Sequence, residues 1–273
     1  MASAPALRLG VHRHGVGPLV RDWRVRRRRS QLDLAYAVGV SPRHLSFVET
    51  GRSKPSPELL LALADGLDVP LRERNVLLLS AGYAPVFAQR QLDDPALRHV
   101  RHAVDLVLKG HEPYPAIAID RHWTLIAYNA VAPRLLAAAD PSLLRPPVNV
   151  LRLSLHPKGL APRIENLAEW RAHLLTRLRQ QIDVTADAEL TKLLDELAAY
   201  PAPGSTKSPR TNVTDEYAGV VVPLRFVTDA GTLSLFSTTT IFGTPVDVTL
   251  SELAIESFFP ADAATADMLR GAS

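Results

Sequence analysis

The sequence predicts an all-α N-terminal domain followed by an α+β domain that contains a five-stranded antiparallel sheet. Three observations predict this division. Residues 30–56 have the pattern of two short helices joined by a tight turn. Basic residues are concentrated early, with 14 lysines and arginines against 9 acidic residues in 1–94, but 17 against 19 in 95–273. The later part has two strand-like segments, then several helical segments, then three more strands.

Composition limits the class of protein. The chain has 273 residues, of which 47% are apolar, so it has room for two domains and a substantial core. Cysteine is absent, which excludes disulfides, thiolate nucleophiles and cysteine-ligated metal centres. No run is long enough to span a bilayer, and no basic-then-apolar leader is present, so we expect a soluble cytoplasmic protein without a membrane partner.

The first elements carry most of the positive charge. Residues 1–16 show no periodicity and are expected to form a flexible arm. Residues 17–29 are expected to form a helix whose inward positions are Leu19, Val20, Trp23 and Val25. The dense basic run in this helix, arginines 24 and 26–29, indicates either a solvated face or contact with a nucleic-acid backbone.

Two short helices are expected next. Ser30 is a suitable N-cap for a helix over 31–38, because its hydroxyl can accept a hydrogen bond from a free N–H of the first turn. Gly39 can adopt the left-handed conformation that ends this helix and turns the chain. Ser41 is expected to cap the second helix, with Pro42 at its first position, where a missing N–H has no cost. This arrangement brings two helices into close contact across a short turn.

The second helix has an inner and an outer face. Leu45 and Val48 are expected to point inward, and Gly51 to end the helix. The pattern resembles the helix-turn-helix of the Cro/phage-repressor (XRE) family. The matching residues are Gln31, Ala35, Gly39, Val40, Ser41, Leu45, Ser46, Glu49, Gly51, Pro55 and Ser56. An ordinary helical hairpin is the alternative, but many residue types agree at fixed spacing.

The resemblance implies that the second helix reads double-stranded DNA from the major groove. Side chains near the start of such a helix contact base edges. Arg43 is the candidate for a bidentate contact to guanine, and His44 and Phe47 follow it. The remaining candidate contacts are Ser41, Pro42 and Ser46 on the same helix, Gln31 at a phosphate by family resemblance, and Arg52 and Lys54 at the DNA backbone. Glu49 is expected to be a structural partner for an arginine of the preceding helix.

Two further helices complete the first domain. Residues 57–67 and 70–81 have helical apolar spacing, which makes five helices in 17–82, as a repressor-like fold requires. The helical pattern breaks after residue 81, and 83–94 is expected to be a linker. We therefore expect a DNA-binding domain over 17–82 and a second domain over 95–270.

The second domain is expected to contain both helices and strands. Residues 95–109 predict an amphipathic helix that bridges the domains or packs on the second one, with an apolar face at Leu97, Val100, Ala103, Val104 and Val107. The other expected elements are strands at 116–120 and 123–128, a short helix from Asn129 to Ala138, helices at 164–182 and 187–199, a loop at 201–212, strands at 217–227 and 232–242, and a helix at 262–270. Residues 149–155 are apolar but short. Residues 249–259 fit a strand or a helix, and we favour a strand as third member of a meander.

The order of these elements is that of a PAS-like domain, in which a five-stranded sheet carries helices on one face and can enclose a ligand cavity. Three stretches resemble the MmyB-like ligand-binding domain of helix-turn-helix regulators: residues 115–130, 149–157 and 236–250. The resemblance implies a small-molecule sensor, with a fatty-acid-like ligand bound non-covalently.

The aromatic residues supply the candidate pocket. It is formed by Trp123, Tyr128, Trp170, Phe226, Phe236 and Phe242, although each of these alone is more often a core residue. Candidate anchors for a polar head group are Arg152, His156 and Arg121. No residues are assigned to catalysis or to a metal, and no further cofactor is expected.

Two other classes remain open. A catalytic second domain is disfavoured because no nucleophile elbow, zinc-binding helix motif or phosphate-binding loop is present. Alternatively, the second domain serves only in dimerisation or protein interaction, in which case DNA affinity would not respond to a small molecule. The favoured interpretation is a transcriptional regulator that binds DNA as a homodimer and senses a small apolar effector.

Overall fold

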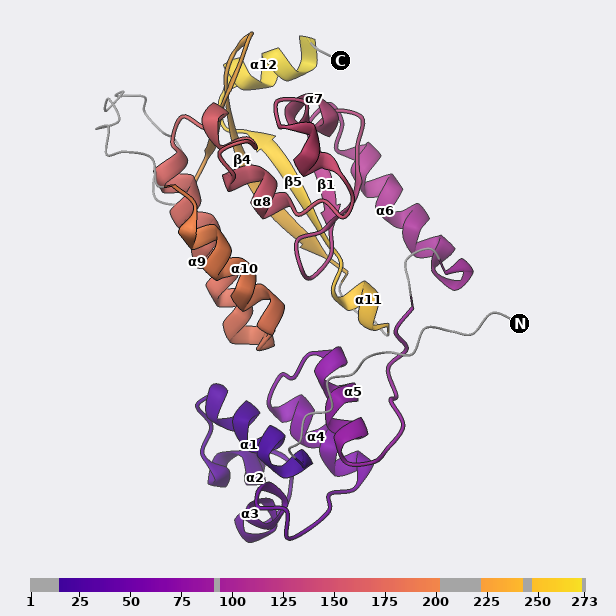
Figure 1. The fold of residues 1–273 in the computed structure, drawn as a ribbon. Helices are drawn as coiled ribbons and strands as arrows, with labels where there is room; N and C mark the ends of the chain where they lie inside the picture. Colours follow the sequence, from indigo (N-terminus) through magenta and orange to yellow (C-terminus); the bar gives the residue numbers. More distant parts are fainter. Residues whose placement is uncertain (1–14, 91–93, 202–221, 243–246, 272–273) are drawn as a thin grey trace. The chain divides into compact units, whose positions relative to one another are not determined.

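The computed structural model describes residues 15–90, 94–201, 222–242 and 247–271, and the chain divides into two compact units, residues 1–89 and 90–273 (Figure 1). Described residues beyond position 82 still belong to the first unit. The Asn75 side chain accepts hydrogen bonds from the N–H groups of Val86 and Phe87 and donates one to the Phe87 carbonyl. The expected linker at 83–94 therefore begins with chain that is bonded to α5.

The first unit is built from five α-helices. They are α1 (Val16–Arg26), α2 (Gln31–Ala37), α3 (Pro42–Glu49), α4 (Pro57–Gly66) and α5 (Leu71–Ser80). The side chains of Ser30, Ser41 and Ser56 each accept a hydrogen bond from the N–H three residues on, which is the N-cap geometry expected at Ser30 and Ser41. Gly39 and Gly51 have φ of +73° and +74°, which a side chain would strain.

The core of the first unit is formed by aliphatic residues from all five helices. Val20, Leu34, Leu45 and Leu63 are all at most 1% exposed, as helical spacing predicts. Val25 was expected to face inward, and this expectation is wrong, because the helix turns its side chain into solvent with 58% exposed. Trp23, two residues earlier, is buried, as expected.

The second unit contains a five-stranded antiparallel sheet. Its strands are β1 (Ala116–Ile119), β2 (Leu125–Tyr128), β3 (Leu224–Thr228), β4 (Gly231–Ile241) and β5 (Ala254–Pro260). Their order is β2-β1-β5-β4-β3, so β3, β4 and β5 form the expected meander and β5 lies at the centre (Figure 1). In the register, Glu256 of β5 lies between Ile117 of β1 and Thr239 of β4.

Helices and short 3₁₀ turns connect and cover the strands. They are η1 (Pro95–Leu97), α6 (Arg98–Gly110), α7 (Ala132–Leu136), η2 (Pro141–Leu144), α8 (Val150–Leu155), η3 (Ala161–Arg163), α9 (Leu167–Thr185), α10 (Ala188–Ala199), α11 (Val248–Ser251) and α12 (Ala263–Gly271). The helix expected over 164–182 is confirmed as α9, with Trp170, Leu174 and Leu178 buried. The helix expected over 187–199 is confirmed as α10, capped by Asp187.

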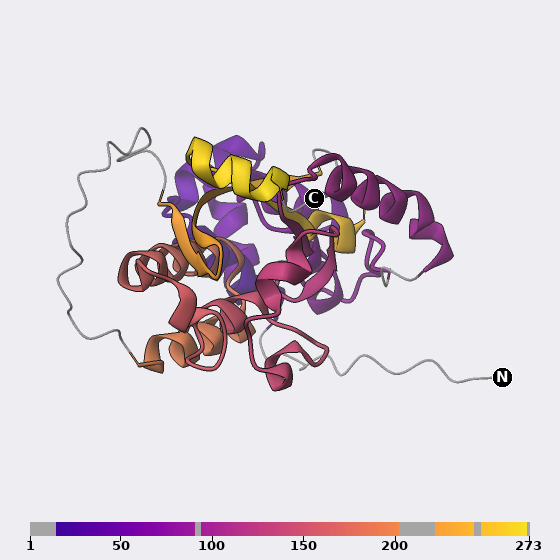
Figure 2. The same ribbon diagram turned by 90° about the horizontal axis from the view of Figure 1, so that it is seen from above.

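Helices pack on both faces of the sheet, not on one face as the sequence suggested. The α8–α10 side carries the main core, and α6 packs on the opposite face against alanines of β1 and residues of β5 (Figure 2). The buried residues of α6 are Val104 and Leu108, and Leu97 of η1 is buried just before them. Val107 was expected on this buried side, but it is 41% exposed because the buried side is centred one position further along the helix.

Two expected strands differ from the structure at their boundaries. Trp123 lies in the β1–β2 turn with a φ of +65°, so the second strand starts at Leu125 and not at residue 123. The segment 249–259 is divided, because α11 covers its start and β5 begins at Ala254. The expected loop at 201–212 and the first residues of the expected strand at 217–227 lie largely outside the described residues.

Candidate DNA interface and ligand cavity

The outer face of α3 carries the residues expected to contact DNA. Ser41 and Arg43 are exposed, whereas Pro42, His44, Ser46 and Phe47 are half-buried on or beside the helix surface. All of them come from the N-cap and the first six positions of α3, so the structure brings them together at one end of one helix. Such an end is the part of a recognition helix that approaches base edges.

Phe47 packs with two arginines. The guanidinium carbon of Arg43 lies 5.4 Å from the centre of the Phe47 ring, and that of Arg52 lies 5.9 Å from the same ring. Lys54 packs in a similar way on Tyr83, with its ammonium nitrogen 4.6 Å from the ring centre. These cation–π contacts limit the freedom of three cations on one surface.

A buried ion pair fixes α3 to the rest of the unit. Arg24 of α1 donates two hydrogen bonds to the Glu49 carboxylate, Nε to Oε1 at 2.6 Å and Nη2 to Oε2 at 2.9 Å. Gln31 donates a third, from Nε2 to Oε2 at 2.7 Å. Burial raises the pKa of Glu49, but the hydrogen bonds from Arg24 and Gln31 outweigh burial and hold the pKa below its usual value.

This network changes two of the expected roles. The arginine that pairs with Glu49 lies in α1, and the helix immediately before α3 supplies Gln31. One amide hydrogen of Gln31 is therefore engaged within the protein, which leaves the other for a phosphate. Arg27, within the basic run, also has an internal role, since it donates to the carbonyl oxygens of Leu67 and Asp68 at 2.8 and 3.0 Å.

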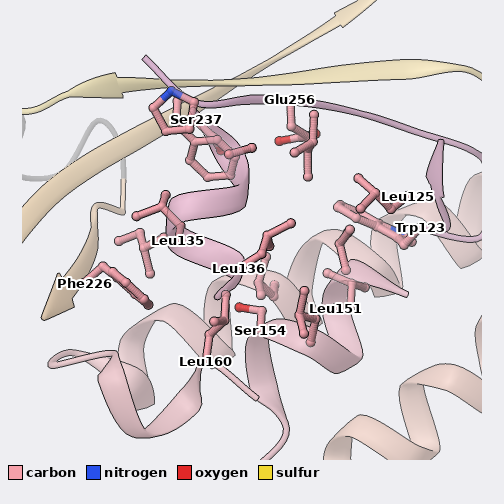
Figure 3. A pocket seen from close by; sticks show the side chains of 18 of the residues that line it. Trp123, Leu125, Leu135, Leu136, Leu151, Ser154, Leu160, Phe226, Ser237 and Glu256 are labelled. Carbon is pink, nitrogen blue, oxygen red and sulfur yellow. The ribbon is translucent and has the colours of Figure 1, made fainter. Parts of the chain in front are cut away.

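The second unit contains an apolar cavity of about 100 Å³ between the sheet and helices α7–α9. Side chains converge on it from the strand side, including Glu256 and Ser237, and from the helix side, including Leu136 and Ser154 (Figure 3). Most of its lining residues are leucine, isoleucine, valine, phenylalanine or tryptophan. A concave apolar space with few polar groups is typical of a small-molecule site.

The structure divides the predicted pocket residues into two groups. Trp123, Trp170 and Phe226 line the cavity. Tyr128 does not line it, because it lies at the end of edge strand β2 with 52% of its surface exposed. Phe236 lies on the opposite side of β4 from the cavity and stacks on Phe259 with ring centres 5.4 Å apart.

Further expected residues lie elsewhere in the unit. Phe242 packs with the cluster under α6, away from the cavity lining. Arg152 is exposed on α8 and makes a bidentate ion pair with Glu196, Nη2 to Oε2 at 2.7 Å. His156 packs on Tyr200. Of the three head-group candidates, Arg121 lines a more polar cavity of about 240 Å³.

The sequence interpretation missed the charged residues of the apolar cavity, Arg177 and Glu256. Each breaks an apolar pattern, and this signal could have found them. Arg177 follows Trp170 and Leu174 on the inward side of α9, and Glu256 interrupts the apolar strand β5. Burial first, and then the charge of Arg177, lower the pKa of His173 on the same helix.

Among the residues that the structure describes, no group of three or more histidine, aspartate or glutamate side chains is arranged to hold a metal ion. None of the described helices has the length and hydrophobicity of a membrane span.

Comparisons with known proteins give two family matches, one in each unit of the chain. Residues 100–272 match the family model described as MmyB-like transcription regulator ligand binding domain, and residues 20–74 match the one described as Helix-turn-helix. A search of the curated proteins found no match.

Two solved structures show a weak likeness. The clp gene regulator ClgR from Corynebacterium glutamicum is 26% identical over 36% of this chain and 90% of its own, with a TM-score of 0.22. An RNA-binding light-oxygen-voltage receptor is 10% identical over 92% of this chain and 60% of its own, with a TM-score of 0.25. TM-scores at this level carry no structural argument.

Proposed function

We propose that this chain, which belongs to the family of the MmyB-like transcription regulator ligand binding domain, controls transcription in response to an apolar small molecule. That it is a DNA-binding helix-turn-helix regulator with a ligand-binding domain follows from its two family matches. The proposal adds the kind of ligand, the residues that contact DNA and ligand, a homodimeric state and a cytoplasmic location.

The apolar cavity is the single observation that carries the ligand assignment. Its wall is almost entirely apolar, and its size of about 100 Å³ corresponds to about three water volumes. This space admits a small apolar molecule or the end of an alkyl chain. A fatty-acid-like ligand, which the family resemblance suggested, would need adjacent side chains to move, because sites for larger ligands measure roughly 300–1,000 Å³.

The exposed end of α3 supports the DNA-binding assignment. We propose that Arg43 contacts a guanine, with Ser41, Pro42, His44, Ser46 and Phe47 beside it at the end and outer face of α3, and that Arg52, Lys54 and Gln31 contact the phosphate backbone. A homodimer would present two such helices to half-sites one helical turn apart. Regulators of this architecture act through binding, so we propose no catalytic activity.

Mass spectrometry of the purified full-length protein tests the ligand assignment. Native spectra are compared with spectra after denaturing extraction. We expect a stoichiometric apolar molecule that is released by denaturation, or uptake of one equivalent when decan-1-ol is added to a clean apoprotein. A chain that neither carries nor takes up any apolar molecule would contradict the proposal and would favour a dimerisation or interaction module. The native spectrum also reports whether the protein is a dimer.

A further inference from the structure

The apolar cavity and the polar cavity share one wall. Trp123, Arg177 and Glu256 line both spaces, of about 100 and 240 Å³. Trp123 is held in place, because its Nε1 donates to Gln181 Oε1 at 2.7 Å and Gln181 in turn donates to the Arg121 carbonyl at 2.8 Å. The shared wall therefore consists of a fixed indole ring and an ion pair.

The ion pair joins helix α9 to the centre of the sheet. Arg177 donates from Nη2 to Glu256 Oε1 at 2.7 Å and from Nη1 to Oε2 at 3.2 Å. Thr239 donates to the same Oε1 at 2.7 Å and accepts from Arg177 Nη2 at 2.9 Å. The guanidinium carbon lies 5.0 Å from the centre of the Trp123 ring.

The two partners differ in exposure and in the kind of element that carries them. Glu256 sits on the central strand with its side chain 5% exposed, between Ile117 and Thr239 of the neighbouring strands. Arg177 has a long side chain, is 25% exposed and reaches the pair from a helix. Glu256 is thus the fixed member of the wall and Arg177 the movable one. Displacement of Arg177 would join the two spaces into one that approaches the size of common ligand sites.

The charges around this wall disfavour an anion. Among the described residues that line the apolar cavity, the charged side chains are Arg177 and Glu256, which neutralise each other. The polar cavity adds Asp120 and Glu252 against Arg121, and Arg121 already pairs with Asp187 at 3.1 Å and lies 3.8 Å from Glu252. A ligand carboxylate here would place a second buried anion beside Glu256, with Arg177 as the nearest shared counter-ion.

An uncharged polar group would not place a second buried negative charge beside Glu256. A guanidinium has five N–H donors, and the bonds from Arg177 described above use three of them. A ligand hydroxyl or carbonyl oxygen could accept from the remaining two without adding charge, and a hydroxyl could donate to Glu256. The wall is therefore suited to a neutral group with hydrogen-bonding capacity.

We propose that the two cavities are the two ends of one site for an uncharged amphipathic molecule, whose alkyl part occupies the apolar cavity and whose hydroxyl, ester or amide end meets the Arg177–Glu256 pair. The proposal rests on the proposed function, since it names the chemical class of that ligand. It assigns Glu256 as the residue that discriminates against a carboxylate, and Arg177 as the movable partition.

Binding of decan-1-ol and decanoate to the full-length protein tests this assignment. Tryptophan fluorescence and calorimetry, at about pH 7.5 where decanoate is ionised, report both affinities. We expect wild-type protein to bind decan-1-ol at least about tenfold more tightly than decanoate, because the buried like charges repel. Glu256→Gln should tighten decanoate binding by about tenfold relative to decan-1-ol binding, because it removes the buried negative charge beside the ligand carboxylate. Glu196→Gln, which neutralises a glutamate paired outside both cavities, is the matched control and should change neither affinity.

The outcomes separate the two proposals. Decanoate binding as tight as decan-1-ol binding in the wild type would overturn the assignment of an uncharged ligand and leave the apolar sensor intact. An unchanged preference in folded Glu256→Gln would show that Glu256 does not discriminate. Absence of binding by either probe would overturn the proposed function itself. The wild-type comparison needs no variant, so it decides the ligand class even if Glu256→Gln fails to fold.

Discussion

At the residue scale, the carboxylate of Glu49 links three helices through one side chain. Three N–H groups, two from Arg24 in α1 and one from Gln31 in α2, donate to it. Glu49 is the last residue of α3, so these bonds set where the DNA-facing helix ends relative to its neighbours. The pair is a positioning device, since the Glu49 side chain is buried and Arg43, the candidate base contact, lies near the other end of the same helix.

Removal of Arg24 should destabilise the first unit strongly. Arg24→Ala leaves the Glu49 charge buried without a counter-ion, and breaking such pairs costs about 3–5 kcal/mol. Urea unfolding followed by circular dichroism measures the loss. Arg29→Ala removes a charge from an exposed side chain of the same basic run and should cost less than about 0.5 kcal/mol. Equal effects of the two substitutions would show that the ion pair does not hold α3 in place.

The lowered pKa of Glu49 makes its contribution dependent on pH. A carboxylate whose folded pKa is below its unfolded value of about 4.3 stabilises the fold above that value, and the contribution is lost as the pH falls through the folded pKa. The difference in unfolding free energy between wild type and Glu49→Gln should therefore be constant from about pH 7 to 5 and shrink below about pH 4.3. A difference that stayed constant down to pH values near 3 would show that folding does not change the pKa of Glu49, and a difference that grew would show that folding raises it.

Base recognition and backbone contact should separate by substitution. Arg43→Ala should cost about 1–3 kcal/mol on the preferred DNA sequence and relax the preference at one base pair. Arg52→Ala and Lys54→Ala should each weaken binding on all sequences and reduce the salt slope by about 1. Selection from random duplexes, followed by titration at several salt concentrations, measures both. Arg179→Ala, an exposed arginine of α9, is the control. Uniform loss of affinity in Arg43→Ala would make Arg43 a phosphate contact.

At the scale of elements, α1 and α3 approach closely at Gly17. A Cβ at this position would collide with the Val48 carbonyl oxygen and lie 2.7 Å from that of Glu49. Only glycine allows this approach, because backbone atoms on α3 cannot move aside without shifting the helix. The position of the DNA-facing helix thus depends on a missing side chain in α1.

Gly17→Ala should therefore lower stability by about 2 kcal/mol or more and weaken DNA binding, since α3 must shift. Gly15→Ala is the matched control, because a Cβ there meets no atom within 4 Å. Its cost should stay near 1 kcal/mol, the usual effect of losing a good N-cap residue. Thermal unfolding and DNA titration of both variants test the expectation. A Gly17→Ala protein with unchanged stability would contradict the close packing of α1 on α3.

Elements with local signals could be predicted from the sequence. Ser30, Gly39 and Ser41 determine the ends of α2 and the start of α3 through bonds within a few residues, and the structure confirms them. The division of 249–259 into α11 and β5 could not be predicted, because pairing of β5 with β1 and β4 decides it and those partners are distant in sequence. Which side of α6 is buried depends likewise on the sheet beneath it.

The candidate cavity was predictable only in part. Aromatic residues mark apolar volume, which is why Trp123, Trp170 and Phe226 were expected at the cavity and line it. Strand alternation places Phe236 on the other face of β4, and periodicity alone does not say which face holds a cavity. Arg177 and Glu256 come from segments 79 residues apart, so their pairing is a property of the fold.

At the scale of the whole molecule, ligand binding by the second unit must be coupled to DNA binding by the first. The first unit carries the basic surface and the second the cavity. A ligand alters DNA binding only by as much as its affinity differs between the DNA-bound and free forms of the chain. The coupling must also be reciprocal, so DNA must change ligand affinity by the same factor.

The most direct test is therefore a titration of a selected DNA duplex with full-length protein, with and without saturating decan-1-ol. Fluorescence anisotropy of the DNA reports affinity, and tryptophan fluorescence confirms that the cavity is occupied. The account predicts that ligand changes DNA affinity by roughly 5–150-fold, and that DNA changes ligand affinity by the same factor. Unchanged DNA affinity in protein whose cavity is shown to be filled would contradict the claim that this chain is a ligand-responsive regulator.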